Sequence, residues 1–197
     1  MKISVVTGGA GFIGSHLVDV LVENGHAVRV IDDLSGGHIS NIAHYQDDER
    51  VDFNHLDINS IEPGNPLFQD VDFCFHLAGI GDIVPSIERP IDYMEINVQG
   101  TVKVLEACRH AGVSKLIYAS SSSCYGIADT PTDEQHAIKP EYPYALSKFL
   151  GEQAAFHWHK IYGLKANAIC IFNAYGTRVR TTGAYGAVFG VFFKQKL

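Results

Sequence analysis

A glycine-rich turn near the amino terminus constrains this chain more than any other feature. Residues 7–14 read TGGAGFIG and directly follow the β-branched run of residues 2–7. Such a run is typical of a strand buried in a parallel sheet. The glycines Gly8, Gly11 and Gly14 permit a tight turn, close approach of a phosphate to the backbone, and close packing of the next helix on the strand. The sequence therefore predicts a pyrophosphate-binding turn between a strand and a helix.

An acidic pair extends this pattern. Apolar residues at helical spacing follow the turn, Asn24 and Gly25 predict the end of that helix, and residues 27–31 predict a second strand. The second strand ends in Asp32 and Asp33, about 20 residues beyond the glycines, where a carboxylate can bind adenosine ribose hydroxyls and repel a 2′-phosphate. We therefore expect a dinucleotide cofactor, NAD rather than NADP, with Asp32 as the ribose ligand and Asp33 as the less favoured candidate. An ordinary glycine-rich turn is the alternative.

Composition sets limits on function. The 197 residues carry a net charge of −7 and no cluster of Lys or Arg, which argues against a nucleic-acid-binding surface. No apolar run reaches the ~20 residues that cross a bilayer, so we expect a cytoplasmic protein with no membrane partner. The four cysteines are far apart and no CxxC or HExxH motif occurs, which favours reduced thiols over a metal site.

The rest of the chain alternates predicted strands with predicted helices. Further strands are expected at residues 51–56, 71–77, 113–119 and 165–171, helices at 91–111 and 144–162, and a poorly helical crossover at 61–68. Right-handed crossovers would place the strands in one parallel sheet. We therefore predict an α/β fold with a Rossmann-type doubly wound parallel sheet.

A tyrosine and a lysine begin the last predicted helix. Tyr144 and Lys148 are four residues apart and so lie on one helical face. Pro143 places Tyr144 in the first turn, where the positive end of the helix favours a phenolate. Lys148 would add a second positive charge and lower the pKa of the phenol from about 10. Such a tyrosine can take a proton from a hydroxyl as hydride leaves for a nicotinamide, although a surface pair is the alternative.

Four consecutive serines follow the fifth predicted strand. One hydroxyl among residues 120–123 would hydrogen-bond the same substrate oxygen as the tyrosine, whereas two or three of the others could simply cap loop backbone. Asp57 lies at the end of the third predicted strand. Its residue type alone fits either a contact to the adenine amino group or an acid on a surface loop.

Together these motifs resemble the extended short-chain dehydrogenases, in particular the NAD-dependent sugar-nucleotide epimerase/dehydratase family typified by UDP-glucose 4-epimerase. The matching segments run in family order through nearly the whole chain: residues 7–14, 32–35, 76–79, 97–101, 120–126, 144–148 and 172–176.

The resemblance implies a role for each matching residue. Tyr144 would be the catalytic acid/base, Lys148 would bind the nicotinamide ribose and depress the tyrosine pKa, and Ser121 would be the catalytic serine because it lies four residues before Tyr125. Asn173 would contact the substrate diphosphate. The implied substrate-binding residues are Ser121, Ser122, Ser123, Tyr144 and Asn173. The implied cofactor-binding residues are Gly8, Gly11, Phe12, Ile13, Gly14, Asp32, Asp33, Ser35, Asp57, Ile58, Leu77, Ala78, Gly79, Asn97, Ala119, Tyr144, Lys148 and Phe172.

The same resemblance separates reaction types. In the 4,6-dehydratases of the family, Asp and Glu follow the catalytic threonine and perform the elimination, whereas Ser122 and Ser123 stand here. This implies an NAD-dependent nucleotide-sugar 4-epimerase of the UDP-glucose or UDP-N-acetylglucosamine type. A dehydratase or 4-keto-reductase of the same family is the enzymatic alternative, and an NAD-responsive scaffold module is the non-enzymatic one.

The resemblance also bears on domain organisation. Family members are longer and carry a small carboxyl-terminal substrate domain, so we expect residues 1–172 to form the NAD-binding domain and residues 173–197 to begin a truncated substrate-binding region. Such a chain would bind NAD and turn over UDP-sugars poorly. The predicted helices 91–111 and 144–162 resemble those that pair in family dimers, which implies a homodimer.

Overall fold

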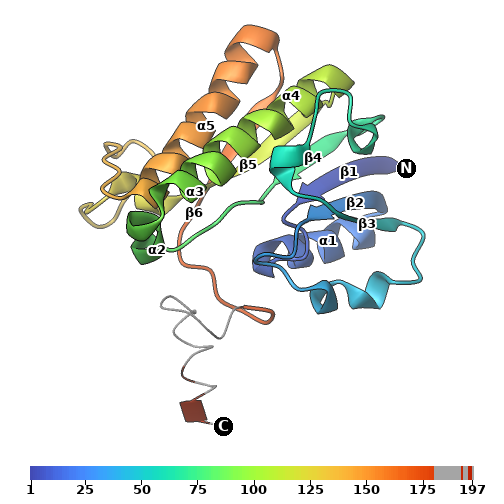
Figure 1. Cartoon of the computed structure of the whole chain (residues 1–197), viewed down its shortest axis with the longest axis horizontal. Coiled ribbons are helices and arrows are strands. Elements are labelled where there is room, and N and C mark those ends of the chain that lie inside the picture. The colour runs from blue at the N-terminus through green and yellow to red at the C-terminus, as the bar shows by residue number, and fades with distance from the viewer. Residues whose placement is uncertain (180–191, 193–194, 197) are drawn as a thin grey trace.

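The computed structural model describes residues 1–179, 192 and 195–196. Six parallel strands form one sheet in the order β3-β2-β1-β4-β5-β6 (Figure 1). The strands are β1 (Lys2–Thr7), β2 (His26–Asp32), β3 (Val51–His55), β4 (Phe73–His76), β5 (Lys115–Ser121) and β6 (Ala166–Ile171). The strand order reverses between β1 and β4, which creates a crevice at the carboxyl edge and confirms the predicted Rossmann-type doubly wound sheet.

Helices cover both faces of the sheet, and each face has its own core. The helix α1 (Phe12–Glu23) packs on one face, and α4 (Thr101–Ala111) and α5 (Pro143–Tyr162) pack on the other (Figure 1). Val5 and Val6 of β1 are both fully buried, Val5 in the core beneath α4 and Val6 in the core beneath α1. This two-sided burial explains why the strand is an apolar run without polar alternation.

The helix predicted at residues 91–111 is interrupted. It begins with α3 (Pro90–Met94), passes through a π-helical turn η5 (Glu95–Gly100) and continues as α4, while α2 (Ile83–Glu88) precedes it and was not predicted. A π turn takes up extra chain and shifts the register of the residues that follow. Along this segment Asn97, Val104 and Leu105 are buried, whereas Val98 and Val102 are only half buried.

The remaining connections of the described chain contain at most short 3₁₀ turns. The poorly helical crossover predicted at residues 61–68 contains only the 3₁₀ turn η4 (Pro66–Phe68), as expected. The other 3₁₀ turns are η1 (Ile39–Asn41), η2 (Ala43–Tyr45), η3 (Ile58–Ser60) and η6 (Ser122–Tyr125).

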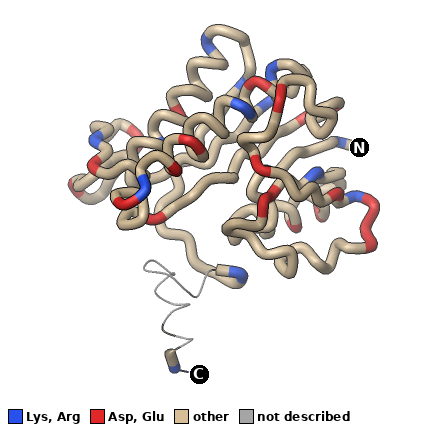
Figure 2. Tube along the Cα trace, viewed as in Figure 1, with Lys and Arg blue, Asp and Glu red and all other residues tan. Residues whose placement is uncertain are grey.

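The surface and the thiols agree with the composition. Lys and Arg lie scattered along the trace with Asp and Glu between them (Figure 2). All four cysteines are free thiols and three of them are buried. Among the described residues, no helix combines the length and the apolar character needed to cross a bilayer. Most of the predicted start of a substrate-binding region, residues 173–197, lies outside the described residues.

Candidate cofactor and active site

The glycine turn joins β1 to α1 as predicted and leaves a helix end open to an anion. Gly8 has a φ of +72°, and a Cβ there would lie 2.7 Å from the backbone nitrogen of Ala78, so the end of β4 packs directly on the turn. No side chain among the described residues caps α1, and its first turn holds no acidic residue. Its first amide groups and the positive end of its dipole are therefore available to a phosphate.

Asp32 braces the glycine turn from the end of β2. Its Oδ2 accepts a hydrogen bond from the amide of Ala10 at 2.9 Å, and its Oδ1 accepts one from the amide of Leu34 at 2.8 Å. Burial raises the pKa of Asp32, while these two amides act in the opposite direction. Each carboxylate oxygen keeps a further lone pair, which suits it to ribose hydroxyls. The arrangement fits the adenosine half of a dinucleotide.

The other two predicted acidic ligands, Asp33 and Asp57, bond to residues close to them in the chain. Asp33 is exposed, and its Oδ1 accepts hydrogen bonds from the amide and the hydroxyl of Ser35 at 2.9 and 2.7 Å. Asp57 is exposed and accepts the amide of Asn59 at 2.9 Å, which caps the turn η3. The side chain of Ile58 is buried in the core beneath α4, so only its backbone is left to meet an adenine.

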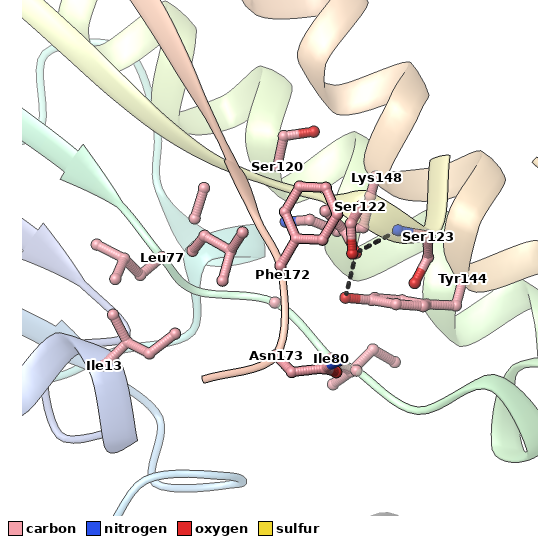
Figure 3. A pocket seen from close by; sticks show the side chains of 15 residues that line it. Ile13, Leu77, Ile80, Ser120, Ser122, Ser123, Tyr144, Lys148, Phe172 and Asn173 are labelled. Carbon is pink, nitrogen blue, oxygen red and sulfur yellow. Dashed lines mark hydrogen bonds between the residues drawn. The ribbon is translucent and has the colours of Figure 1, made fainter. Parts of the chain in front are cut away.

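A pocket of about 320 Å³ lies at the carboxyl ends of β4, β5 and β6, between the glycine turn and α5 (Figure 3). The predicted site residues that line it are Ile13, Leu77, Gly79, Ala119, Ser121, Ser122, Ser123, Tyr144, Lys148, Phe172 and Asn173. Ile80, Gly81, Ser120 and Ile171 also line it and were not predicted as site residues. The predicted residues outside its lining are Gly8, Gly11, Phe12, Gly14, Asp32, Asp33, Ser35, Asp57, Ile58, Ala78 and Asn97.

Tyr144 and Ser121 meet inside this pocket. Tyr144 lies in the first turn of α5, as predicted, and its hydroxyl donates to Ser121 Oγ at 3.3 Å. The amide of Ser123 donates to the same Oγ at 3.2 Å. Because Ser121 Oγ accepts both bonds, its own proton is available to an oxygen atom in the pocket. The ring of Tyr93 packs edge-on against that of Tyr144, with centroids 6.2 Å apart.

The strand that carries Ser121 is longer than predicted. β5 continues to Ser121 instead of ending at Ala119, because Ser120 and Ser121 pair with Cys170 and Ile171 of β6. This pairing holds the backbone of Ser121 in the sheet. Ser122 and Ser123 begin the turn η6.

The predicted lowering of the Tyr144 pKa by Lys148 is wrong for the chain by itself. Burial raises the pKa of Tyr144, and the hydrogen bond with Ser121 only partly opposes this effect. The ammonium of Lys148 lies instead over the ring of Tyr118, 4.5 Å from its centroid. The tyrosine is therefore held in its protonated form.

Lys148 is a buried cation that faces the pocket. Its side chain is buried, which lowers its pKa to about 8. It forms no salt bridge and donates no hydrogen bond within the part of the chain that the structure describes. The hydroxyl of Tyr118 donates to the backbone carbonyl of Lys148 at 3.2 Å and holds this part of α5 against β5. A buried ammonium with unused donors matches the hydroxyls of a cofactor ribose.

Asn97 ties the loop after β4 to α5. Its Nδ2 donates to the carbonyl of Ile80 and to Ser147 Oγ, both at 2.9 Å, and its Oδ1 accepts the amide of Ile80 at 2.9 Å. Ser147 in turn donates to the carbonyl of Tyr144 at 2.8 Å. The π turn that carries Asn97 thus fixes the loop after β4 relative to Tyr144.

A buried histidine extends this network to the glycine turn. His76 Nδ1 lies 2.7 Å from Thr7 Oγ1, and its Nε2 lies 2.9 Å from Thr101 Oγ1. Thr101 donates its own proton to the carbonyl of Asn97 at 2.7 Å, so it must accept from His76 Nε2. Burial, with Lys148 nearby, lowers the pKa of His76 to about 3, so the ring is neutral. The segment 76–79 had indicated a family motif, but nothing in its residue types indicated this role.

Comparisons with known proteins agree with this geometry. Residues 4–195 match the model of the NAD dependent epimerase/dehydratase family. The chain is 37% identical to the UDP-glucose 4-epimerase of Mycolicibacterium smegmatis over 188 residues, which cover 94% of this chain and 60% of that protein.

Solved structures give the same result. A UDP-N-acetylglucosamine 4-epimerase from Methanobrevibacter ruminantium M1 superposes with a TM-score of 0.92 at 33% identity, over 98% of this chain and 62% of that one. The dTDP-glucose 4,6-dehydratase DesIV from Streptomyces venezuelae, solved with NAD bound, superposes with a TM-score of 0.84 at 33% identity, over 90% of this chain and 57% of that one. The chain thus spans about 60% of the length of these relatives. It belongs to the NAD-dependent epimerase/dehydratase family.

Proposed function

We propose that the chain binds NAD in the crevice and that its protein is a nucleotide-sugar 4-epimerase acting on UDP-glucose or UDP-N-acetylglucosamine. The observation that carries the proposal is the hydrogen bond between Tyr144 and Ser121 beside the buried ammonium of Lys148, at the carboxyl edge of a doubly wound sheet. The glycine turn and Asp32 would hold the adenosine diphosphate half, and Lys148 the nicotinamide ribose.

The residues of the pocket divide the work of the reaction. Bound NAD would supply the acceptor, and later the donor, of the C4 hydride. Ser121 would donate a hydrogen bond to the C4 oxygen of the sugar. Tyr144 would first lose its own proton to solvent, and the phenolate would then take the C4 hydroxyl proton as the hydride leaves and return it when the hydride comes back to the opposite face. Asn173, with Ser122 and Ser123, would orient the sugar nucleotide.

The lining of the pocket favours epimerisation over dehydration. Loss of water across C5 and C6 needs a base and an acid besides the tyrosine, and no carboxylate is among the described residues that line the pocket. Incubation with UDP-glucose in D2O, followed by NMR, separates the two reactions. We expect UDP-galactose without carbon-bound deuterium, formed slowly by this chain. A 4-keto-6-deoxy product with deuterium from the solvent would instead identify a dehydratase.

Asp32 predicts the choice between NAD and NADP. Replacing it with asparagine removes the charge that repels a 2′-phosphate, and it also weakens charge-assisted hydrogen bonds to the ribose. The ratio of NAD to NADP affinity is expected to fall by about tenfold or more, as measured by calorimetric titration. Asp33→Asn serves as the comparison, since Asp33 is exposed and already bonds Ser35. A larger effect at Asp33 would reverse the assignment.

We further propose a homodimer formed through the exposed surface of α3 and α5. Ile91, Leu146 and Leu150 are 76%, 38% and 37% exposed, which leaves apolar surface on α3 and α5. Sedimentation of the chain is expected to give a dimer, and Leu150→Lys is expected to shift it toward the monomer. A wild-type monomer at all concentrations would reject this interface.

A further inference from the structure

The segment after β6 crosses the cofactor crevice. Residues 173–178, here named the strap, leave the end of β6 and descend to α1 on the other side of the sheet (Figure 1). Phe172 and Asn173 line the pocket that holds Tyr144, and Figure 3 places them between Tyr144 and Ile13 in that view. A second cavity of about 410 Å³ follows, lined by Tyr175, Gly176 and Thr177 of the strap and by Phe12, Ile13 and His16 of α1.

The two cavities meet at one residue of the proposed cofactor site. Ile13, at the amino end of α1, lines both of them. The strap therefore runs along the same path that links the phosphate-binding end of α1 to Tyr144. A dinucleotide that reaches from one to the other must extend alongside the strap.

An ion pair fastens the far end of the strap. Arg178 Nη1 lies 2.7 Å from Asp19 Oδ2, and the two side chains are only 24% and 21% exposed. The other oxygen of Asp19 lies 2.9 Å from His44 Nε2, and the carbonyl of Thr177 lies 3.1 Å from His16 Nε2. Burial would raise the pKa of Asp19, but hydrogen bonds from His44 and Arg178 outweigh it and hold that pKa below its ordinary value. Asp19 is therefore ionised at neutral pH.

The backbone at this point needs such support. Arg178 has a φ of +63°, in the left-handed region that residues other than glycine rarely adopt. A residue persists in this conformation only where its surroundings hold it there. Within the described residues, the ion pair with Asp19 is the contact that holds the Arg178 side chain in place.

We propose that Arg178 and Asp19 are positioning residues that latch the strap over the crevice, and that opening this latch limits the exchange of the dinucleotide. The proposal rests on the proposed function, because it requires NAD in the crevice. It also meets a chemical need of that function. A 4-epimerase returns the hydride to the sugar it came from, so a reduced cofactor that escaped between the two steps would leave a keto-sugar behind.

Asp19→Asn tests the latch, because it removes the charge and keeps the shape of the side chain. NAD dissociation, followed by stopped-flow displacement, is expected to become about tenfold faster, as the loss of one charge-assisted hydrogen bond predicts. The association rate is expected to rise or stay unchanged. Asp48→Asn is the matched control, since it breaks the ion pair between Asp48 and Arg50, which lies before β3 and does not involve the strap. An unchanged dissociation rate in Asp19→Asn would overturn the proposal.

A second measurement separates the latch from the proposed function. In the cofactor-free chain, amide hydrogen exchange of residues 173–178 is expected to be about tenfold faster in Asp19→Asn than in wild type or Asp48→Asn. Arg178→Gln removes the other partner and is expected to give the same result, which covers the case of an unstable Asp19 variant. Faster amide hydrogen exchange in the variants, in a chain that binds no NAD, would support the latch and reject the proposed binding of NAD. Equal exchange in all variants would reject the latch even where NAD binds.

Discussion

Replacing Tyr144 with phenylalanine is expected to lower the rate of sugar-nucleotide epimerisation by about 10²–10⁴-fold, the usual contribution of a positioned acid/base. Phenylalanine keeps the ring that packs against Tyr93 but removes the hydroxyl that reaches Ser121. The affinity for NAD is expected to stay within a factor of about three, since no phosphate contact is lost. Conversion of UDP-galactose to UDP-glucose should be measured with the chain in excess over the sugar nucleotide, because the chain spans about 60% of its relatives.

Tyr142→Phe is the matched control for this variant. Tyr142 precedes α5, is 40% exposed and does not line the pocket. Its hydroxyl is expected to be dispensable. Equal product formation by Tyr144→Phe and wild type would reject Tyr144 as the acid/base. If every other measurable function also persisted, the scaffold alternative would be favoured.

Replacing Lys148 with methionine is expected to stabilise the cofactor-free chain and to weaken its binding of NAD. Burial of the ammonium without a carboxylate lowers its pKa from 10.5 to about 8, which marks a cost of keeping it charged. After allowing for the lost contact with the ring of Tyr118, the free energy of unfolding should rise by about 2 kcal/mol. Loss of the ribose donors should weaken NAD binding by about tenfold or more. Denaturant unfolding and calorimetric titration measure the two effects.

The stabilisation by Lys148→Met should depend on pH in a defined window. Below about pH 8, Lys148 is charged in the folded and unfolded chain, and the full cost of its burial is present. Between pH 8 and 10.5 the unfolded chain binds more protons than the folded chain, so the stability of wild type rises relative to the variant. The difference between the two should therefore shrink as the pH rises through this window.

Lys160→Met is the control for these measurements, because Lys160 lies in the last turn of α5 and is exposed. It should change neither the stability nor the NAD affinity appreciably. A destabilised Lys148→Met chain would show that the buried ammonium stabilises the fold. An unchanged NAD affinity would show that the ammonium does not bind the cofactor.

The sequence predicted those parts of the fold that are determined by residues close together in the chain. The apolar run before Gly8, the glycine spacing and Asp32 at the end of the next strand lie within one strand-helix-strand unit, so their order alone predicts the turn between β1 and α1. Tyr144 was placed in the first turn of α5 for the same reason, since Pro143 marks that turn.

The features that the sequence could not predict depend on contacts between distant segments. The direction of the Tyr144 pKa is set by burial of the phenol in the folded chain, where its ring packs against that of Tyr93. The π turn at Asn97 is selected by hydrogen bonds to Ile80 and Ser147, both far along the chain. Arg178 and Asp19 are 159 residues apart in the sequence, and no motif joins them.

Calorimetric titration of the chain with NAD, then with NADP, and then with UDP-glucose on the NAD complex, tests the account most directly. We expect saturable binding of one NAD per chain, clearly weaker binding of NADP because of Asp32, and weak binding of the sugar nucleotide. A folded chain that takes up no NAD at any concentration, or one that prefers NADP, would contradict it.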